Sequence, residues 1–370
     1  PIRNELGITH CQFGNIYATA TIFSSLLLIW IGKKIDEYQI IYYSFFVIFL
    51  LFFSSLFFSF INSIYFLAAG IFLIRFSGQG LMSHTSTTTI SRFFVKSRGK
   101  ALSTIWFGLS SAEFILPVLI TYLFAIYSWR SVWQGIAIII IFFLPFVIFK
   151  TIKTIKLDSR EIEQNSKMSL EIKSWRRKEV IKDYRFYIIS LNMLAMTWIA
   201  TGVFVYQSFI SDSKMWNIFT IPKAFMIYSI ASIITLFFSG FLVDKYSSRK
   251  LISLMNIPLL FAMFVLMYYQ HEVSAYIFLG LIGVSNGLAN VLGSSTWAEI
   301  YGVKFIGSIK ALTTAFMVFS TAFGTAVFGQ FIDNGFSVEN IAFIAAIYIV
   351  VSLVLLIIIR NSLEPINIRK

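Results

Sequence analysis

The chain has 370 residues, of which 58% are hydrophobic and 13% charged, and its mean hydropathy is +0.80. Soluble domains have about half apolar and about a quarter charged residues, so this composition excludes an ordinary soluble enzyme. It also excludes a disordered chain, because 41 phenylalanines cannot stay solvated. The net charge of +13 comes from short basic clusters between apolar runs, a pattern that sets membrane topology and does not indicate a nucleic-acid partner. We therefore expect a polytopic membrane protein.

Apolar runs long enough to cross a bilayer recur along the whole chain. They are too long and too uniformly apolar for the alternating strands of a barrel, so they predict helices and an all-α polytopic fold. The eleven predicted spanning segments are 13–31, 40–60, 64–90, 101–126, 129–151, 186–210, 219–243, 250–269, 274–298, 307–332 and 341–360.

Basic loops orient these segments. Most of the 30 lysines and arginines fall in alternate loops, which we predict to be cytoplasmic. This topology places the C-terminus in the cytoplasm and Pro1 outside, in a multi-pass protein of the cell (inner or plasma) membrane. Because the chain does not begin with Met, the simplest account is an N-terminal truncation that removes a first helix. The alternative is a true eleven-helix protein with an external N-terminus.

One long polar stretch divides the apolar segments into two groups. We predict an N-terminal bundle over 1–151, a cytoplasmic linker over 152–185, a C-terminal bundle over 186–360 and a cytoplasmic tail over 361–370. The linker is basic and partly amphipathic. It could lie on anionic lipid headgroups, or it could be a solvated tether.

An internal repeat relates the two halves. Three pairs of segments recur at offsets of 207 to 210 residues: Gly32–Tyr38 with Gly240–Tyr246, Lys100–Thr104 with Lys310–Thr314, and Ser77–Leu81 with Val284–Leu288. The offset spans six predicted helices, an even number, so both halves run in the same direction through the membrane. Two parallel six-helix halves around a central site are typical of transporters.

With these motifs the sequence resembles the major facilitator superfamily. The family's loop motif, a glycine and an aspartate followed by basic residues, is matched at Gly32 and Asp36, and at Gly240 and Asp244 with Arg249. The resemblance covers the chain except for the absent first helix and implies two six-helix bundles, with eleven helices present and twelve expected. Glu37 stands where the family usually has Arg, and the family's antiporter and sugar-porter signatures are poorly matched or missing.

The resemblance also implies a cytoplasmic latch. The loop motif would hold one half to the other, against the start of the eleventh family helix near Gly307. We expect Asp36 and Asp244 to begin the helices that follow their turns, where a carboxylate satisfies free backbone N–H groups. Glu299, at the inner end of its helix, is interpreted as a gate or topology charge.

Two charged residues fall inside predicted spans, and such residues are functional candidates by default. Arg75 and Glu113 lie at similar depths in consecutive antiparallel helices, so an ion pair between them is geometrically reasonable. Arg75 stays protonated, whereas Glu113 can titrate. Movement of Arg75 between Glu113 and a substrate would couple transport to protons. The alternative is a static pair that only packs two helices.

Polar residues predict which faces line a central cavity. In the family fold the fourth, seventh and tenth helices line the centre, and the corresponding segments here carry Gln79, Thr197, Thr201, Asn286 and Asn290. The alternative is that these side chains make hydrogen bonds between helices. The glycines at 283 and 287 are interpreted as close-packing positions.

The function predicted from these residues is secondary active transport by alternating access. We expect proton-coupled uptake (symport) of a small organic anion, because Arg75 is the deepest charge outside the loops. The alternatives are a proton-driven exporter of amphipathic compounds and a transporter-like sensor without flux. We expect no enzyme, catalytic residue, metal site or cofactor, since no catalytic motif is present and the one cysteine and three histidines lack ligand spacing. The expected partners are the small-molecule substrate, protons and the lipid bilayer, with a monomeric protein.

Overall fold

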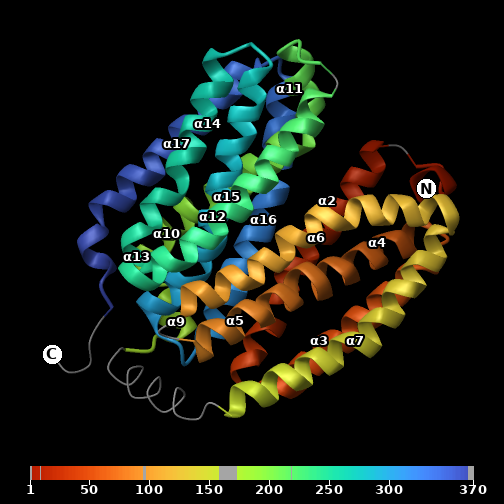
Figure 1. Cartoon of the computed structure of the whole chain (residues 1–370), viewed down its shortest axis with the longest axis vertical. Coiled ribbons are helices and arrows are strands. Elements are labelled where there is room, and N and C mark those ends of the chain that lie inside the picture. The colour runs from red at the N-terminus through yellow and green to blue at the C-terminus, as the bar shows by residue number, and fades with distance from the viewer. Residues whose placement is uncertain (1, 9, 95–96, 158–172, 218, 366–370) are drawn as a thin grey trace. The chain divides into compact units, whose positions relative to one another are not determined.

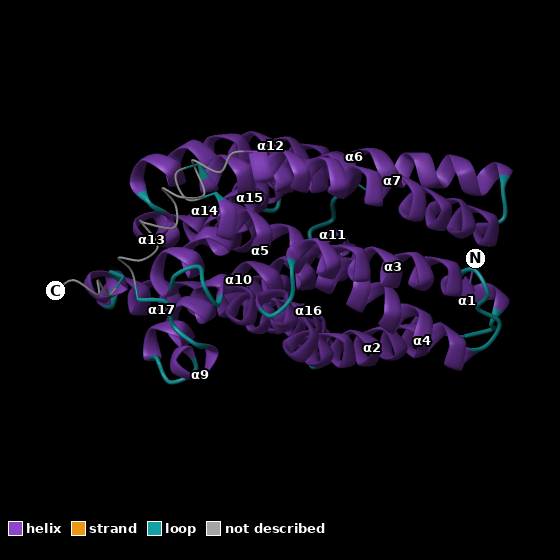
Figure 2. Ribbon diagram, turned by 90° about the horizontal axis from the view of Figure 1, so that it is seen from below, coloured by secondary structure: helices purple, strands orange, loops and turns teal. Residues whose placement is uncertain are grey.

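The computed structural model describes residues 2–8, 10–94, 97–157, 173–217 and 219–365, apart from some side chains within the helices. Every regular element over these residues is a helix (Figure 2). The elements before the linker are α1 (Ile2–Glu5), α2 (His10–Ile31), η1 (Gly32–Asp36), α3 (Ile40–Phe58), α4 (Ile64–Ile74), η2 (Arg75–Met82), α5 (Ser83–Phe93), α6 (Arg98–Ile126) and α7 (Trp129–Leu157). Those after it are α9 (Arg177–Val180), α10 (Tyr184–Val205), α11 (Gln207–Ser213), α12 (Thr220–Tyr246), α13 (Ser248–Leu251), η3 (Ile252–Asn256), α14 (Ile257–Tyr268), α15 (Val273–Tyr301), α16 (Ile306–Asp333), α17 (Val338–Ile358) and η4 (Arg360–Leu363).

The predicted all-α membrane fold is confirmed. Among the described residues, 10 helical segments are long and apolar enough to cross a membrane. They coincide with the predicted spans, and α6 occupies the remaining predicted segment, 101–126. Many large apolar side chains on these helices are exposed, as expected of helices that face lipid.

The chain forms two compact units. Unit 1 comprises Pro1–Thr89, Glu113–Leu170 and Lys304–Phe319, and unit 2 comprises Ile90–Ala112, Glu171–Val303 and Ser320–Lys370. Each unit therefore contains one short section from the other half of the chain. These sections are the start of α16 in unit 1, and the end of α5 with the start of α6 in unit 2.

In unit 1 the predicted helix over 64–90 contains a wide turn. Its middle, η2, is a π-helix between α4 and α5. Glycines at 78 and 80 lower the helix propensity of this stretch, and the Ser77 hydroxyl donates to the Leu73 carbonyl at 2.7 Å. A short π segment within an α-helix is frequent at functional sites, and this one begins at Arg75.

In unit 2, helices α12 and α15 pack closely and run side by side (Figure 1). A Cβ added at Gly287 would lie 2.7 Å from the Ser232 carbonyl oxygen, and one at Gly283 would overlap the backbone of Tyr228. The interpretation of these glycines as close-packing positions is confirmed, because only glycine allows the two backbones to approach this closely.

Candidate functional site

Arg75 is the first residue of η2, and its side chain is half-buried. Its guanidinium lies over the ring of Tyr17 on α2, 4.9 Å from the ring centroid. The Nε atom is buried without a hydrogen-bond partner, and among the described side chains no carboxylate forms an ion pair with Arg75. The aromatic ring holds the cation in place, while the guanidinium keeps N–H donors that could bind an anion.

The predicted partner of Arg75 lies outside the described side chains. Glu113 is within α6, but its carboxylate is not described, so the Arg75–Glu113 pair stays a prediction. Gln79 lies in η2, four residues after Arg75, and its side chain is exposed. Arg75 and Gln79 both belong to unit 1.

The remaining polar candidates belong to unit 2. The Thr197 hydroxyl lies 2.8 Å from the Leu194 carbonyl and 2.9 Å from the Ser320 hydroxyl on α16. The Thr201 hydroxyl donates to the carbonyl of Thr197 at 2.6 Å. These contacts agree with the alternative interpretation, hydrogen bonding within and between helices.

On α15, Asn286 donates from Nδ2 to the Ser232 hydroxyl on α12 at 3.1 Å, so it also joins two helices. Asn290, one turn further on, is half-buried. A role in substrate binding stays a prediction for Gln79, Thr197, Thr201, Asn286 and Asn290.

The first loop motif caps a helix from the opposite half of the chain. Asp36 accepts hydrogen bonds from the backbone N–H groups of Gly307 at 2.9 Å and Ser308 at 2.6 Å, in the first turn of α16. Our expectation that Asp36 begins the next helix along the chain was wrong, because Asp36 is the last residue of η1. Its carboxylate satisfies the free N–H groups of a distant helix instead.

The second loop motif repeats this arrangement. Asp244 lies in the last turn of α12, so the same expectation was wrong for it. Its carboxylate accepts from the N–H groups of Gly99 at 2.7 Å and Lys100 at 3.2 Å, in the first turn of α6. One offset of 208 residues relates Asp36 to Asp244 and also Gly99 to Gly307. The internal repeat is thus expressed as two matched carboxylate caps, which we call the latches.

The glycine of each motif allows close approach at its latch. A Cβ at Gly32 would lie 2.7 Å from the Cβ of Ala311 on α16. A Cβ at Gly240 would lie 2.6 Å from the Ser103 hydroxyl on α6. A larger residue at either position would push the capped helix away from its aspartate.

Glu299, near the end of α15, caps a third helix. Its carboxylate accepts from the Ser247 hydroxyl at 2.7 Å and from the backbone N–H groups of Ser248 and Arg249 at 2.9 and 3.2 Å. Glu299 therefore holds α13, which follows the second loop motif. The Arg249 guanidinium lies 3.6 Å from the exposed carboxylate of Glu364.

Two polar residues lie buried behind the first latch. Lys310 is only 4% exposed, and its ammonium donates to the Thr87 carbonyl at 2.9 Å. His84 is fully buried, and its Nε2 lies 2.9 Å from the Gly32 carbonyl oxygen. The burial of Lys310 was not predicted from the sequence, although the repeat of Lys100–Thr104 in Lys310–Thr314 was an available signal.

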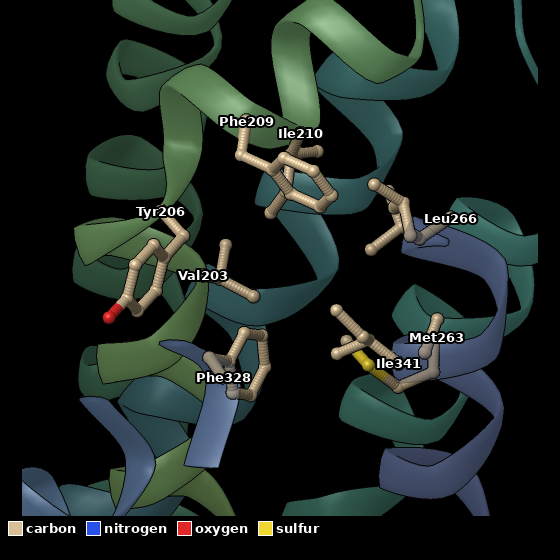
Figure 3. A pocket seen from close by; sticks show the side chains of 10 residues that line it. Val203, Tyr206, Phe209, Ile210, Met263, Leu266, Phe328 and Ile341 are labelled. Carbon is tan, nitrogen blue, oxygen red and sulfur yellow. The ribbon is translucent and has the colours of Figure 1, made fainter. Parts of the chain in front are cut away.

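Unit 2 encloses an apolar cavity at the junction of α10, α11, α14, α16 and α17 (Figure 3). Phe209, Phe328 and Met263 point into it, and its volume is about 10 Å³. This volume leaves room for about one water molecule, so the cavity does not by itself indicate a substrate site. Among the described residues, no group of three or more His, Cys, Asp or Glu side chains could hold a metal ion.

Comparison with known proteins identifies the family. The chain matches the profile of the Major Facilitator Superfamily over residues 1–222 and again over 188–369. The chain belongs to this superfamily of membrane transporters, as its repeat and paired loop motifs predicted. Membrane transport of a small molecule is therefore its general function. None of the curated proteins compared with the chain matches its sequence.

Solved structures share the fold at low sequence identity. A crystal structure of a bacterial homologue of the iron transporter ferroportin, in an outward-facing state, has a TM-score of 0.68 and 15% identity, covering 96% of this chain and 92% of that one. The crystal structure of the human organic anion transporter MFSD10 (TETRAN) has a TM-score of 0.71 and 13% identity, covering 93% of this chain and 83% of that one. At these identities the similarity establishes the fold alone.

Proposed function

We propose that the protein is a secondary active transporter that takes up a small organic anion together with protons by alternating access. The observation that carries this proposal is Arg75, a half-buried guanidinium on a π-helix within a membrane span. A charge inside a bilayer is costly unless it is paired or functional. Tyr17 supports the cation without neutralising it, and this leaves Arg75 suited to a carboxylate or phosphate.

The latches support alternating access. Each is a pair of hydrogen bonds from a helix N-terminus to one carboxylate, strengthened by the helix dipole. Such contacts are strong enough to hold a closed gate and weak enough to break in each cycle. They join sections from opposite halves of the chain, so a movement that separates these halves at the predicted cytoplasmic end would break both latches.

The similar structures do not decide the cargo. One of them is described as an organic anion transporter, which supports an anionic substrate. The other is a homologue of an iron transporter, so the shared fold serves different cargoes. The inference therefore depends on the chemistry of Arg75.

Uptake into proteoliposomes tests the anion site. We expect accumulation of a carboxylate or phosphate compound that Arg75→Gln abolishes and Arg75→Lys restores only partly, because lysine lacks the bidentate geometry. Lys223→Gln is the control, since this exposed lysine lies in the first turn of α12 outside the candidate site. Uptake that Arg75→Gln leaves unchanged would contradict the anion site.

Proton coupling is tested at Glu113. Glu113→Gln should abolish accumulation driven by a pH gradient while leaving exchange of internal for external substrate, since a neutral side chain can no longer release a proton. Full accumulation by Glu113→Gln would contradict the coupling role and favour a static pair of Glu113 with Arg75. A protein that binds the anion but shows no flux of either kind would be a sensor.

A groove in unit 1 favours export of amphipathic compounds as a second candidate function. It has a volume of about 660 Å³ between α2 and α4 and is mostly apolar, with Phe23 and Phe72 in its lining. Lipophilic cations should then be exported, and Phe72→Ala should weaken their transport more than Arg75→Gln does. If Arg75→Gln weakens transport more than Phe72→Ala does, the result favours anion uptake.

A further inference from the structure

The last part of the predicted linker is fixed to unit 2 and is not a free tether. The backbone N–H of Trp175 donates to the Tyr301 carbonyl at 2.9 Å, and the two rings meet edge to face with centroids 5.5 Å apart. Val180 of α9 is fully buried. Segment 173–183 therefore presents a defined outer surface at the entry to α10 (Figure 1).

Arg185 completes this attachment. Its guanidinium forms a buried ion pair with Asp183 at 2.8 Å and lies 5.2 Å from the centroid of the Trp175 ring. It also donates to the carbonyl of Ser362 at 2.8 Å, within the predicted C-terminal tail. The segment is thus held by backbone bonds, ring contacts and one buried ion pair.

The outer surface of the segment combines lysines with aromatic side chains. Lys178 and Lys182 are exposed and lie one turn apart, with Ile181 exposed beside them. In the first turn of α10, Tyr184 and Tyr187 are 57% and 51% exposed. The Tyr187 hydroxyl donates to the Ile181 carbonyl at 2.8 Å, which joins the two parts of the surface. We call these five residues the basic–aromatic face.

The positive charge of this face is not neutralised within the segment. Glu179 forms an ion pair with Lys173 at 3.1 Å and accepts from the Arg176 backbone N–H at 2.7 Å. These hydrogen bonds, with Arg176 the larger cause and Lys173 next, hold the pKa of Glu179 below its ordinary value. Asp183 is occupied by Arg185. Both nearby carboxylates are engaged, and no described carboxylate forms an ion pair with Lys178 or Lys182.

We propose that the basic–aromatic face binds the headgroup of an anionic phospholipid at the predicted cytoplasmic surface of the membrane. The face lies where a spanning helix begins, so it is at headgroup depth. Tyrosines favour this depth because their rings are apolar and their hydroxyls polar, and lysines there attract anionic lipids. The inference concerns a lipid site outside the transport site and does not depend on the identity of the cargo.

Lipid binding to the purified protein in a neutral detergent tests this proposal. We would titrate phosphatidylglycerol or phosphatidylcholine and count bound lipids by native mass spectrometry. We expect Lys178→Gln/Lys182→Gln to weaken phosphatidylglycerol binding by roughly tenfold or more, since each lysine near a membrane surface contributes about 1 kcal/mol to anionic lipid binding. The matched control is Lys245→Gln/Lys250→Gln, which removes two exposed lysines at the same end of unit 2.

The control variant should bind phosphatidylglycerol within about twofold of the unaltered protein, and phosphatidylcholine should not distinguish the variants. Equal losses in the two double variants would overturn the proposal, because net charge and not this face would then govern binding. Equal affinity for the two lipids would overturn it as well. Tyr184→Ala/Tyr187→Ala provides a second check, since it removes the rings and keeps both lysines.

Discussion

At the residue scale, the ion pair between Glu5 and Arg130 joins the start of the chain to α7 in unit 1. The carboxylate of Glu5 on α1 accepts hydrogen bonds from Nη1 and Nη2 of Arg130, at 2.9 and 2.6 Å, and from the Trp129 indole N–H at 3.1 Å. Arg130 also donates to the Ile61 carbonyl at 2.9 Å, so one side chain joins three parts of unit 1. The hydrogen bonds from Arg130, followed by that from Trp129, hold the pKa of Glu5 below its ordinary value.

This shift predicts a stability difference that depends on pH. Because the pKa of Glu5 is lower in the folded protein, its stabilising effect is complete above the ordinary carboxyl pKa and is lost as the pH falls through the lowered value. The melting temperature of Glu5→Gln should lie below that of the unaltered protein at pH 7, and the two should converge under acid conditions. A difference that stays constant down to pH 3 would contradict this role.

At the element scale, the packing of α12 against α15 depends on glycine. Gly283→Ala should lower the free energy of unfolding by about 1–3 kcal/mol, because the added methyl group overlaps the Tyr228 backbone, which cannot yield as a side chain can. Thermal unfolding in detergent measures the effect. Gly135→Ala on α7 is the control, since a Cβ there meets no atom within 4 Å and alanine has the higher helix propensity. A loss of stability there as large as that of Gly283→Ala would contradict the contact explanation.

The elements also differ in how far the sequence predicted them. Long apolar runs predicted the spanning helices, because length and hydropathy are properties of the segment itself. The π-helix at Arg75 was not predicted, although Gly78 and Gly80 lie within the predicted span 64–90. Those glycines permit a wide turn, but contacts such as Ser77 with Ser54, at 3.0 Å, depend on neighbouring helices.

At the scale of the whole molecule, the proposed alternating access predicts that the two latches influence which state is populated. Loss of an N-cap costs about 1 kcal/mol, which corresponds to about fivefold in a conformational equilibrium. We therefore expect Asp36→Ala and Asp244→Ala each to shift the protein about fivefold toward the state that is open at the latch end, and the double variant to shift it further.

Alkylation measures this shift. With Cys11 replaced by serine, a cysteine at Ser91 reports access to the latch end, because that hydroxyl is buried against the Ser294 carbonyl. Its reaction rate with a polar maleimide should rise in both aspartate variants. Glu37→Ala is the matched control, since Glu37 adjoins Asp36 but pairs locally with Lys34 at 2.5 Å. Faster labelling in Glu37→Ala would contradict the role of the latch, and so would a labelling rate that does not rise in Asp36→Ala.

The sequence alone determined the class of protein, its spanning segments, the internal repeat and the residues of both loop motifs. These properties follow from composition and from local or repeated patterns. The family resemblance already implied a latch near Gly307, but only the tertiary structure decided that the carboxylate of Asp36 binds the free N–H groups of that helix, since this contact exists only after the helices pack. The same reason explains why Tyr17 beneath Arg75 and Lys310 at the Thr87 carbonyl were not predicted: each pairs a side chain with a helix that no local pattern specifies.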